Sequence, residues 1–194
     1  MKNRFASWHT LGCVLLLATL PLQAATPKSG TDARPAMDWI HPVIPKFGAM
    51  HPRPDAAVQP DPGADYKVFV DVVSAHTDHA KLLPALDRLA RMVNLMGYAK
   101  VPAEHLHIVV LLNEGAAMAG WTNATYRSKF HIDNPNLDLV HALHKAGVQL
   151  LVCSQALAGQ GLPDSAVDPD VTVSLSGVTD PVIYGQRGYS YMRL

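Results

Sequence analysis

The sequence predicts a three-layer α/β fold, in which helices cover both faces of a mostly parallel sheet. The first observation is that strand-like and helix-like segments alternate along residues 66–194. The second is that the strand-like segments are apolar throughout rather than at every second residue, which is typical of strands buried on both faces. With 194 residues, 48% of them apolar, the chain is long enough for one domain with a sizeable core.

Apolar runs rich in β-branched residues predict the strands. In the first run, Asp71 is the only residue that interrupts a series of valines and one phenylalanine. The second and third runs are apolar with almost no interruption. The predicted strands are residues 66–73, 106–112, 148–153, 171–175 and 189–194.

The segments between these runs predict helices. Over residues 80–97, leucine, valine and methionine recur at steps of three and four, which places them on one face of a helix. Residues 122–130 predict a shorter helix. Asn134 and Pro135 predict the start of a third, as a capping side chain followed by proline in the first turn, and Gly147 marks its end.

Residues 1–24 have the three-part layout of a secretory signal peptide. Lys2 and Arg4 precede an apolar run over residues 11–20, and small residues follow, with cleavage expected after Ala24. The run is shorter than the roughly 20 residues that a membrane-spanning helix requires. We expect a periplasmic or secreted protein with no stable membrane anchor after cleavage; an uncleaved anchor is the alternative.

Residues 25–65 predict a proline-rich extended arm. The segment contains eight of the 15 prolines, which excludes a long helix or a central strand. Apolar residues such as Trp39, Ile44 and Phe47 nevertheless favour contact with a surface, so we expect the middle of the arm to lie on the α/β domain (residues 66–194) or on a neighbouring subunit. A disordered tether is the alternative.

The charge balance and the cysteines narrow the possible functions. The chain has 16 basic residues (Lys and Arg) and 16 acidic residues (Asp and Glu), so its formal net charge is zero. The absence of a basic excess argues against a nucleic-acid-binding protein. Cleavage after Ala24 removes Cys13 and leaves Cys153 as a single thiol. A single cysteine cannot form a disulfide within its own chain, so it is either a buried core residue or a reactive thiol.

The carboxyl ends of two predicted strands carry candidate site residues, because ligands bind at these ends in open parallel sheets. The third strand ends at Cys153, and a short helix starting at Ser154 or Gln155 would favour the thiolate through its backbone N–H groups. We therefore identify Cys153 as the candidate catalytic residue. The expected pocket residues are Asn113, Glu114, Gly115, Ser154 and Gln155.

Several segments resemble the DsrE/DsrF-like family, whose fold is called YchN-like, and more narrowly its exported, signal-peptide-bearing branch. The cysteine segment at 152–157 (VCSQAL) and the upstream segments at 134–137 (NPNL) and 146–148 (AGV) carry most of the resemblance. Further similar segments are residues 47–52 (FGAMHP), 54–56 (PDA), 86–91 (LDRLAR) with Asn94, and 188–189 (GY).

The resemblance implies a flavodoxin-like layer, assembly into trimers or hexamers, and a role in sulfur relay. Cys153 matches the family's acceptor cysteine, which would hold a persulfide received from a donor protein or a small sulfur compound. Many relatives have His-Gly after the second strand, whereas this chain has Asn113-Glu114-Gly115. Any proton transfer at that place would therefore use Glu114 or would have no residue to perform it.

Two other function classes remain open. One is a non-catalytic oligomeric module that binds a small ligand or a protein, with Cys153 as a core residue. The other is a metal-binding protein, since ten histidines include three closely spaced pairs. The pair His76 and His79 is the best candidate, because Asp71 and Asp78 are near; the others are His105 with His107 and His141 with His144. No complete dinucleotide fingerprint or P-loop is present, so we expect no cofactor.

Overall fold

The structure is a computed structural model, and it describes residues 38–74 and 77–194. The signal peptide predicted over residues 1–24 and the beginning of the arm lie outside the described residues.

Five strands form one sheet in the order β4-β3-β2-β1-β5, and every neighbouring pair is parallel. The strands are β1 (Tyr66–Val72), β2 (Leu106–Leu112), β3 (Gln149–Cys153), β4 (Val171–Ser174) and β5 (Ser190–Arg193). The α/β fold predicted from the sequence is confirmed, and the sheet is parallel throughout. The carboxyl ends of all five strands consequently lie at the same edge.

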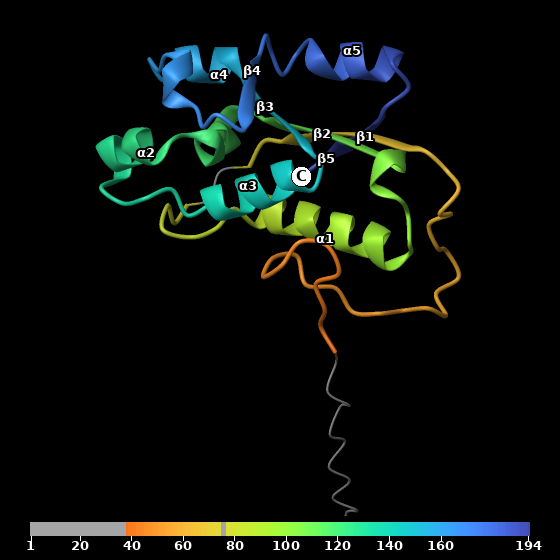
Figure 1. Cartoon of the computed structure of the whole chain (residues 1–194). Coiled ribbons are helices and arrows are strands. Elements are labelled where there is room, and N and C mark those ends of the chain that lie inside the picture. The colour runs from red at the N-terminus through yellow and green to blue at the C-terminus, as the bar shows by residue number, and fades with distance from the viewer. Residues whose placement is uncertain (1–37, 75–76) are drawn as a thin grey trace, which may run out of the picture. The chain divides into compact units, whose positions relative to one another are not determined.

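Helices lie on both faces of the sheet, with α1 and α3 on one side and α4 and α5 on the other (Figure 1). The helices are α1 (Pro84–Tyr98), α2 (Asn123–Phe130), α3 (Leu137–Lys145), α4 (Ser154–Gly159) and α5 (Asp180–Gln186), and the 3-10 segments are η1 (Ala103–His105), η2 (Glu114–Gly120) and η3 (Asp164–Ala166). Within the described ranges, no helix combines the length and apolar character needed to cross a bilayer.

Two separate apolar clusters result, because neighbouring residues of a strand point to opposite faces. The larger cluster lies under α1 and α3 and includes Val110 of β2 and Leu150 of β3. The smaller cluster lies on the opposite face and consists of five buried residues: Phe69, Val109, Leu111, Leu151 and Cys153. The face of the sheet that carries this smaller cluster, on the side of α4 and α5, is the thinly covered face, and the candidate cysteine belongs to it.

The first helix begins later than predicted. The periodicity predicts a start at residue 80, whereas α1 begins at Pro84. Proline favours the first helical turn because its φ angle is fixed and it has no N–H group to satisfy. The preceding residue, Leu83, donates its N–H to the side chain of Asn136 at 2.8 Å, which joins the start of α1 to the start of α3.

The predicted start of α3 at Asn134 and Pro135 is wrong, since the helix begins at Leu137. Asn134 is buried, and its amide donates to the backbone carbonyls of Ala119 and Trp121 at 3.1 and 2.8 Å. Its side-chain oxygen accepts the N–H of Asn136 at 3.0 Å, so the side chain joins the loop around Trp121 to the turn that leads into α3. The predicted end of the helix agrees with the structure, because Gly147 follows it with a φ of +88°.

The described part of the arm folds back on itself between Ile40 and Met50. These two residues form an isolated antiparallel bridge, with backbone hydrogen bonds of 2.9 and 3.0 Å. The prolines predict an extended arm. The bridge shows that the described part of the arm is not extended throughout. Met50 and Ile44 are both almost inaccessible, so the folded segment contributes apolar side chains to the interior.

A buried asparagine of α1, Asn94, holds this segment on the helix. Its side-chain oxygen accepts the N–H groups of Val43 and Ile44 at 2.9 and 2.8 Å. Its amide nitrogen donates to the carbonyls of Phe47 and Gly48, both at 2.9 Å. Four hydrogen bonds from one side chain fix the middle of the arm on α1 of the same chain.

Candidate functional site

Cys153 ends β3 and directly precedes α4, as the sequence predicts for a strand followed by a short helix. The residue is only 3% exposed, and it belongs to the smaller cluster together with Leu111 and Leu151. It also lines a pocket of about 390 Å³ at the carboxyl edge of the sheet. The thiol is thus a buried group at the base of a pocket.

The sulfur accepts a backbone hydrogen bond. The N–H of Gly177, in the loop between β4 and α5, lies 3.3 Å from Sγ of Cys153. A backbone N–H directed at the sulfur can hydrogen-bond an anionic sulfur on Cys153. The sequence predicts that backbone N–H groups after Cys153 perform this role, whereas the donor in the structure comes from 24 residues further along the chain.

The loop that carries Gly177 is fixed at both ends. The hydroxyl of Ser174 donates to the buried carboxylate of Asp180, which joins the end of β4 to the start of α5. The hydroxyl of Ser154 donates to the carbonyl of Leu175 at 2.6 Å, which ties the loop to α4. The position of the Gly177 donor is therefore determined by side-chain hydrogen bonds.

Gly177 has no room for a side chain unless Asn113, which follows β2, moves. A Cβ atom on Gly177 would lie 2.2 Å from Nδ2 of Asn113. Asn113 in turn bonds the backbone N–H of Glu114 at 2.9 Å through its side-chain oxygen, and so caps η2. The ends of β2 and β4 thus meet across the pocket without room for a further carbon atom.

Most of the predicted pocket residues line this pocket, but two do not. Asn113, Glu114, Cys153 and Gln155 are lining residues. Gly115 is not, since it lies within η2, and Ser154 is not, since its hydroxyl is bound to the loop after β4. The remaining lining residues are Asp71, Ala156, Ser176, Gly177, Val178 and Arg193.

Sequence reasoning missed the charged residues of β1 and β5 in this pocket. Asp71 and Arg193 are register partners in the parallel pair of β1 and β5. Asp71 is buried, and it accepts hydrogen bonds from the Asn113 amide at 3.3 Å and the Tyr191 hydroxyl at 3.0 Å. A lone carboxylate within an apolar strand is a signal that could have identified Asp71. Nothing in the local sequence of Arg193 indicates its neighbour, because the pairing joins residues far apart in the chain.

The phenol of Tyr191 is part of the same group. Tyr191 is about half exposed, and desolvation, followed by the hydrogen bond of its hydroxyl to Asp71, raises its pKa above the ordinary value. The hydroxyl therefore remains a donor to the Asp71 carboxylate at neutral pH. Glu114 lies at the other side of the pocket, with an exposed side chain and a left-handed backbone (φ +46°) that turns the chain at the end of β2.

The histidine pair that the sequence favours for a metal is only partly described. His76 lies outside the described residues. His79 stacks on Phe130, with a ring separation of 3.9 Å. Among the described residues, the donor atoms close enough to share a metal ion belong to a different set, His141, Asp168 and Asp170, which lies outside the pocket.

The sheet and the pocket together define a class: parallel α/β proteins with a cysteine at the carboxyl end of an interior strand. The DsrE/DsrF-like family matches residues 67–194, and the chain belongs to this family. The match includes all five strands from the second residue of β1 onward, together with Cys153 and Gly177.

Two solved structures are similar to the chain. One is protein MTH1491, of unknown function, from Methanobacterium thermoautotrophicum, with 20% identity, a TM-score of 0.46, and coverage of 67% of this chain and 100% of that one. The other is the ychN protein from E. coli, with 17% identity, a TM-score of 0.48, and coverage of 66% and 99%. No curated protein matches the chain.

Proposed function

We propose that the protein is a sulfur carrier that holds a sulfane sulfur on Cys153 as a persulfide. The single observation that carries the proposal is the hydrogen bond from the Gly177 N–H to the sulfur, at the base of a pocket. A cysteine that only filled the core would need neither the donor nor the opening. The family to which the chain belongs is associated with sulfur relay.

The transfer step requires no external oxidant. The Cys153 thiolate attacks the terminal sulfur of a donor persulfide, R–S–S–H, and a new S–S bond forms to Cys153. The S–S bond of the donor breaks, and the donor leaves as the thiolate R–S⁻. The proton stays on the transferred sulfur, so charge and electrons balance. The thiolate is the required nucleophile, which is why a donor directed at Sγ supports the proposal.

The pocket residues suit the persulfide end of a donor protein or a small sulfur compound. The charged lining residues of the pocket are two carboxylates, Asp71 and Glu114, and one cation, Arg193. Arg193 supplies a positive charge, and the amides of Asn113 and Gln155 supply neutral hydrogen-bonding groups. Glu114 is the exposed carboxylate nearest the place where many relatives have histidine, and we assign it any proton exchange with the transferred sulfur. A pocket of about 390 Å³ is large enough for a polysulfide chain or a cysteine persulfide.

The test is to incubate the full chain with inorganic polysulfide, remove the excess, and measure the intact mass and the modified peptide. We expect one added sulfur atom, located on Cys153, and none in Cys153→Ser. Gly177→Ala should slow the reaction roughly tenfold, since it displaces a hydrogen bond to a charged group. Gly185→Ala is the matched control, because a Cβ atom there meets nothing within 4 Å.

Two outcomes would overturn the proposal. One is a thiol that reacts with polysulfide and with small alkylating reagents only after the protein is unfolded. The other is equal reactivity of Gly177→Ala and Gly185→Ala in folded protein. Complete protection of the thiol, together with full activity of Cys153→Ser in cells, would favour the non-catalytic binding module.

We also propose that the protein is exported and acts in the periplasm or outside the cell. The support is the layout of residues 1–24, with two cations, an apolar run and small residues before the expected cleavage after Ala24. Protein recovered from the cell envelope or medium should begin at Ala25, as measured by N-terminal peptide mass. Mature protein that retains Met1 would contradict cleavage.

A homo-oligomer is the third part of the proposal, with a second copy of the chain on the thinly covered face. Large apolar side chains are exposed around α5 and the edge strand β5: Leu175, Val178, Val182, Ile183, Tyr191 and Met192. An edge strand with exposed apolar side chains is a ready surface for association. Light scattering should give a trimer or hexamer, which Val182→Lys dissociates and Val58→Lys, on the arm, does not. A monomeric wild-type chain would contradict this assembly.

A further inference from the structure

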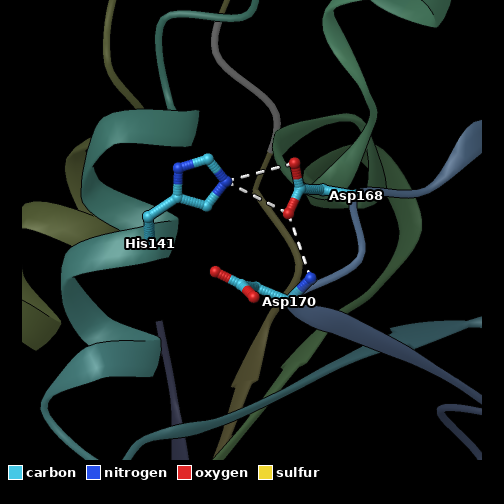
Figure 2. Close-up of side chains that lie close together, drawn as sticks. All are labelled: His141, Asp168 and Asp170. Atoms are coloured by element: carbon cyan, nitrogen blue, oxygen red, sulfur yellow. Dashed lines mark hydrogen bonds and ion pairs between the residues drawn. The ribbon is translucent and has the colours of Figure 1, made fainter.

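Two histidines of α3 lie opposite two aspartates that immediately precede β4. His141 and His144 are one turn apart on α3, and Asp168 and Asp170 lie in the segment before Val171. Figure 2 shows the imidazole of His141 pointing from the helix toward the carboxylate of Asp168, with Asp170 beside them. These residues do not line the cysteine pocket, so the group is separate from the proposed sulfur site.

The donor atoms of this group are close together. Nε2 of His141 lies 3.1 Å from both carboxylate oxygens of Asp168. One donor atom each from His141, Asp168 and Asp170 lie within 4.8 Å of one another. Nε2 of His144 lies 3.7 Å from Oδ1 of Asp170. Three or four oxygen and nitrogen donors therefore converge on one small volume.

The charge of this group is not balanced by a permanent cation. Asp168 is buried, at 7% exposure, and its carboxylate accepts the backbone N–H of Asp170 at 3.1 Å. In the described part of the chain, its ion-pair contact is with His141, and that of Asp170 is with His144; neither aspartate pairs with lysine or arginine. A bound divalent cation would supply a positive charge beside both carboxylates.

We propose that His141, Asp168 and Asp170 bind a divalent transition-metal ion of the Zn²⁺ class, with His144 as the fourth ligand. Imidazole nitrogen and carboxylate oxygen are both ordinary zinc ligands, and the two histidines favour such a metal over Ca²⁺ or Mg²⁺, which prefer oxygen donors alone. The histidines occupy positions i and i+3 of one helix, which places both rings on the same face.

The spacing fits a zinc ion after small side-chain movements. Two donors on one tetrahedral zinc ion, each at about 2.1 Å, are roughly 3.4 Å apart. The contact between His141 and Asp168 already has nearly this separation. The Asp170 carboxylate and the His144 ring are the groups that must move, and both are partly exposed and free to turn about their side-chain bonds. The backbone need not change.

Bound metal would join α3 to the segment before β4. Those elements lie on the face of the larger cluster and come from parts of the chain 27 residues apart. A ligand that binds only the folded chain raises its stability in proportion to the logarithm of the ligand concentration. At a hundredfold excess of Zn²⁺ over the dissociation constant, Tm should rise by about 5–10 °C.

The test is isothermal titration of the full chain with Zn²⁺ after removal of metals by a chelator. We expect one Zn²⁺ per chain, and binding weakened at least about 100-fold in His141→Gln and in Asp168→Asn. His107→Gln is the matched control, since His107 also lies near a single carboxylate, Asp65, at 3.9 Å. Its affinity should equal that of the wild-type chain.

Two measurements separate this site from the cysteine and from a structural role. With Co²⁺ in place of Zn²⁺, the absorption spectrum should contain no thiolate-to-metal charge-transfer band, and Cys153→Ser should bind normally. His141 is half exposed, so His141→Gln should fold even if Asp168→Asn does not. No stoichiometric binding by the wild-type chain, or equal affinity of His141→Gln and His107→Gln, would overturn the proposal. A pair of His141 and Asp168 that only stabilises the fold would give one of these two results.

Discussion

On one face of the sheet, α1, α3 and the folded arm bury the larger apolar cluster, whereas on the other face α4 and α5 bury only five residues beneath them. The same strands supply both faces, since residues alternate along each of them. The helices of the first face expose few apolar side chains, while α5 on the second face and the edge strand β5 expose several. The difference separates the part of the fold that supplies stability from the part that carries the candidate site.

The thin layer also explains how a cysteine can be buried and yet reach a pocket. Cys153 lies at the rim of the smaller cluster, where α4 begins and the loop after β4 returns. A thicker layer of helices would cover this edge. We infer that the chain keeps its second face shallow where the pocket opens, and that the first face compensates in stability.

The largest expected effect is a loss of unfolding free energy, compared between two neighbouring residues of one strand that point to opposite faces of the sheet. Leu150 and Leu151 are neighbours in β3, and both are nearly inaccessible. Leu150→Ala should lower the free energy of unfolding by about 3–4 kcal/mol, because it leaves a cavity in the larger cluster. Leu151→Ala should lower it by about 2 kcal/mol, because the thin layer can close over the gap.

Urea unfolding at one fixed protein concentration measures both values. The pair forms its own control, since the residue type, the strand and the burial are the same. Equal losses, or a greater loss for Leu151→Ala, would contradict the view that the first face supplies most of the stability.

A smaller effect is expected from the side chain that adds the arm to the first face. Asn94→Ala removes four hydrogen bonds to residues 43–48 and should cost about 2 kcal/mol, since buried backbone groups lose their partners. The sheet should remain folded while the arm becomes sensitive to protease. Limited proteolysis of residues 38–65, compared between variant and wild type, measures this release. An arm that stays protected in Asn94→Ala would mean that its apolar side chains hold it without the asparagine.

The sequence predicts the strands well because their signal is local. The apolar run at residues 106–112 coincides with β2, and the carboxyl-end rule for parallel sheets brings Asn113 and Cys153 to one pocket. The predicted start of α3 is wrong for a physical reason: Asn134 bonds the N–H of Asn136 as a cap would, but its amide also donates to the distant Trp121 carbonyl, and the helix begins only at Leu137. Local propensity cannot report a tertiary partner.

The donors and charges around Cys153 could not be predicted from the sequence for the same reason. The Gly177 N–H reaches the sulfur only because the loop between β4 and α5 is tied at both ends, and the alternation of segments does not predict α5. Asp71 and Arg193 meet only through the pairing of β1 with β5. Residue types at strand ends indicate where a site lies, while its electrostatics depend on contacts between distant segments.

The smallest expected effect compares one tyrosine on each face under alkaline conditions. Burial raises the pKa of Tyr126, which is inaccessible in the larger cluster and donates to the carbonyl of His79. Burial also raises the pKa of Tyr184 on the second face; the Arg187 guanidinium lowers it, while Tyr189 and Asp180 raise it. Tyr126 is buried whereas Tyr184 is only partly buried, so we expect the contribution of Tyr126 to alkaline sensitivity to be the larger.

A raised pKa in the folded chain means that the neutral phenol is favoured by folding. The resulting stability is complete below the unfolded-state pKa of about 10 and is lost as pH rises through the folded-state pKa. Tyr126→Phe should therefore flatten the fall in unfolding free energy above pH ~10, by at most about 1.4 kcal/mol per pH unit for one proton. Tyr184→Phe should flatten it less. Urea unfolding between pH 8 and about 11, with reductant present, measures how steeply the unfolding free energy falls with pH in each variant. If Tyr184→Phe flattened this fall more than Tyr126→Phe, the alkaline sensitivity would lie on the second face instead.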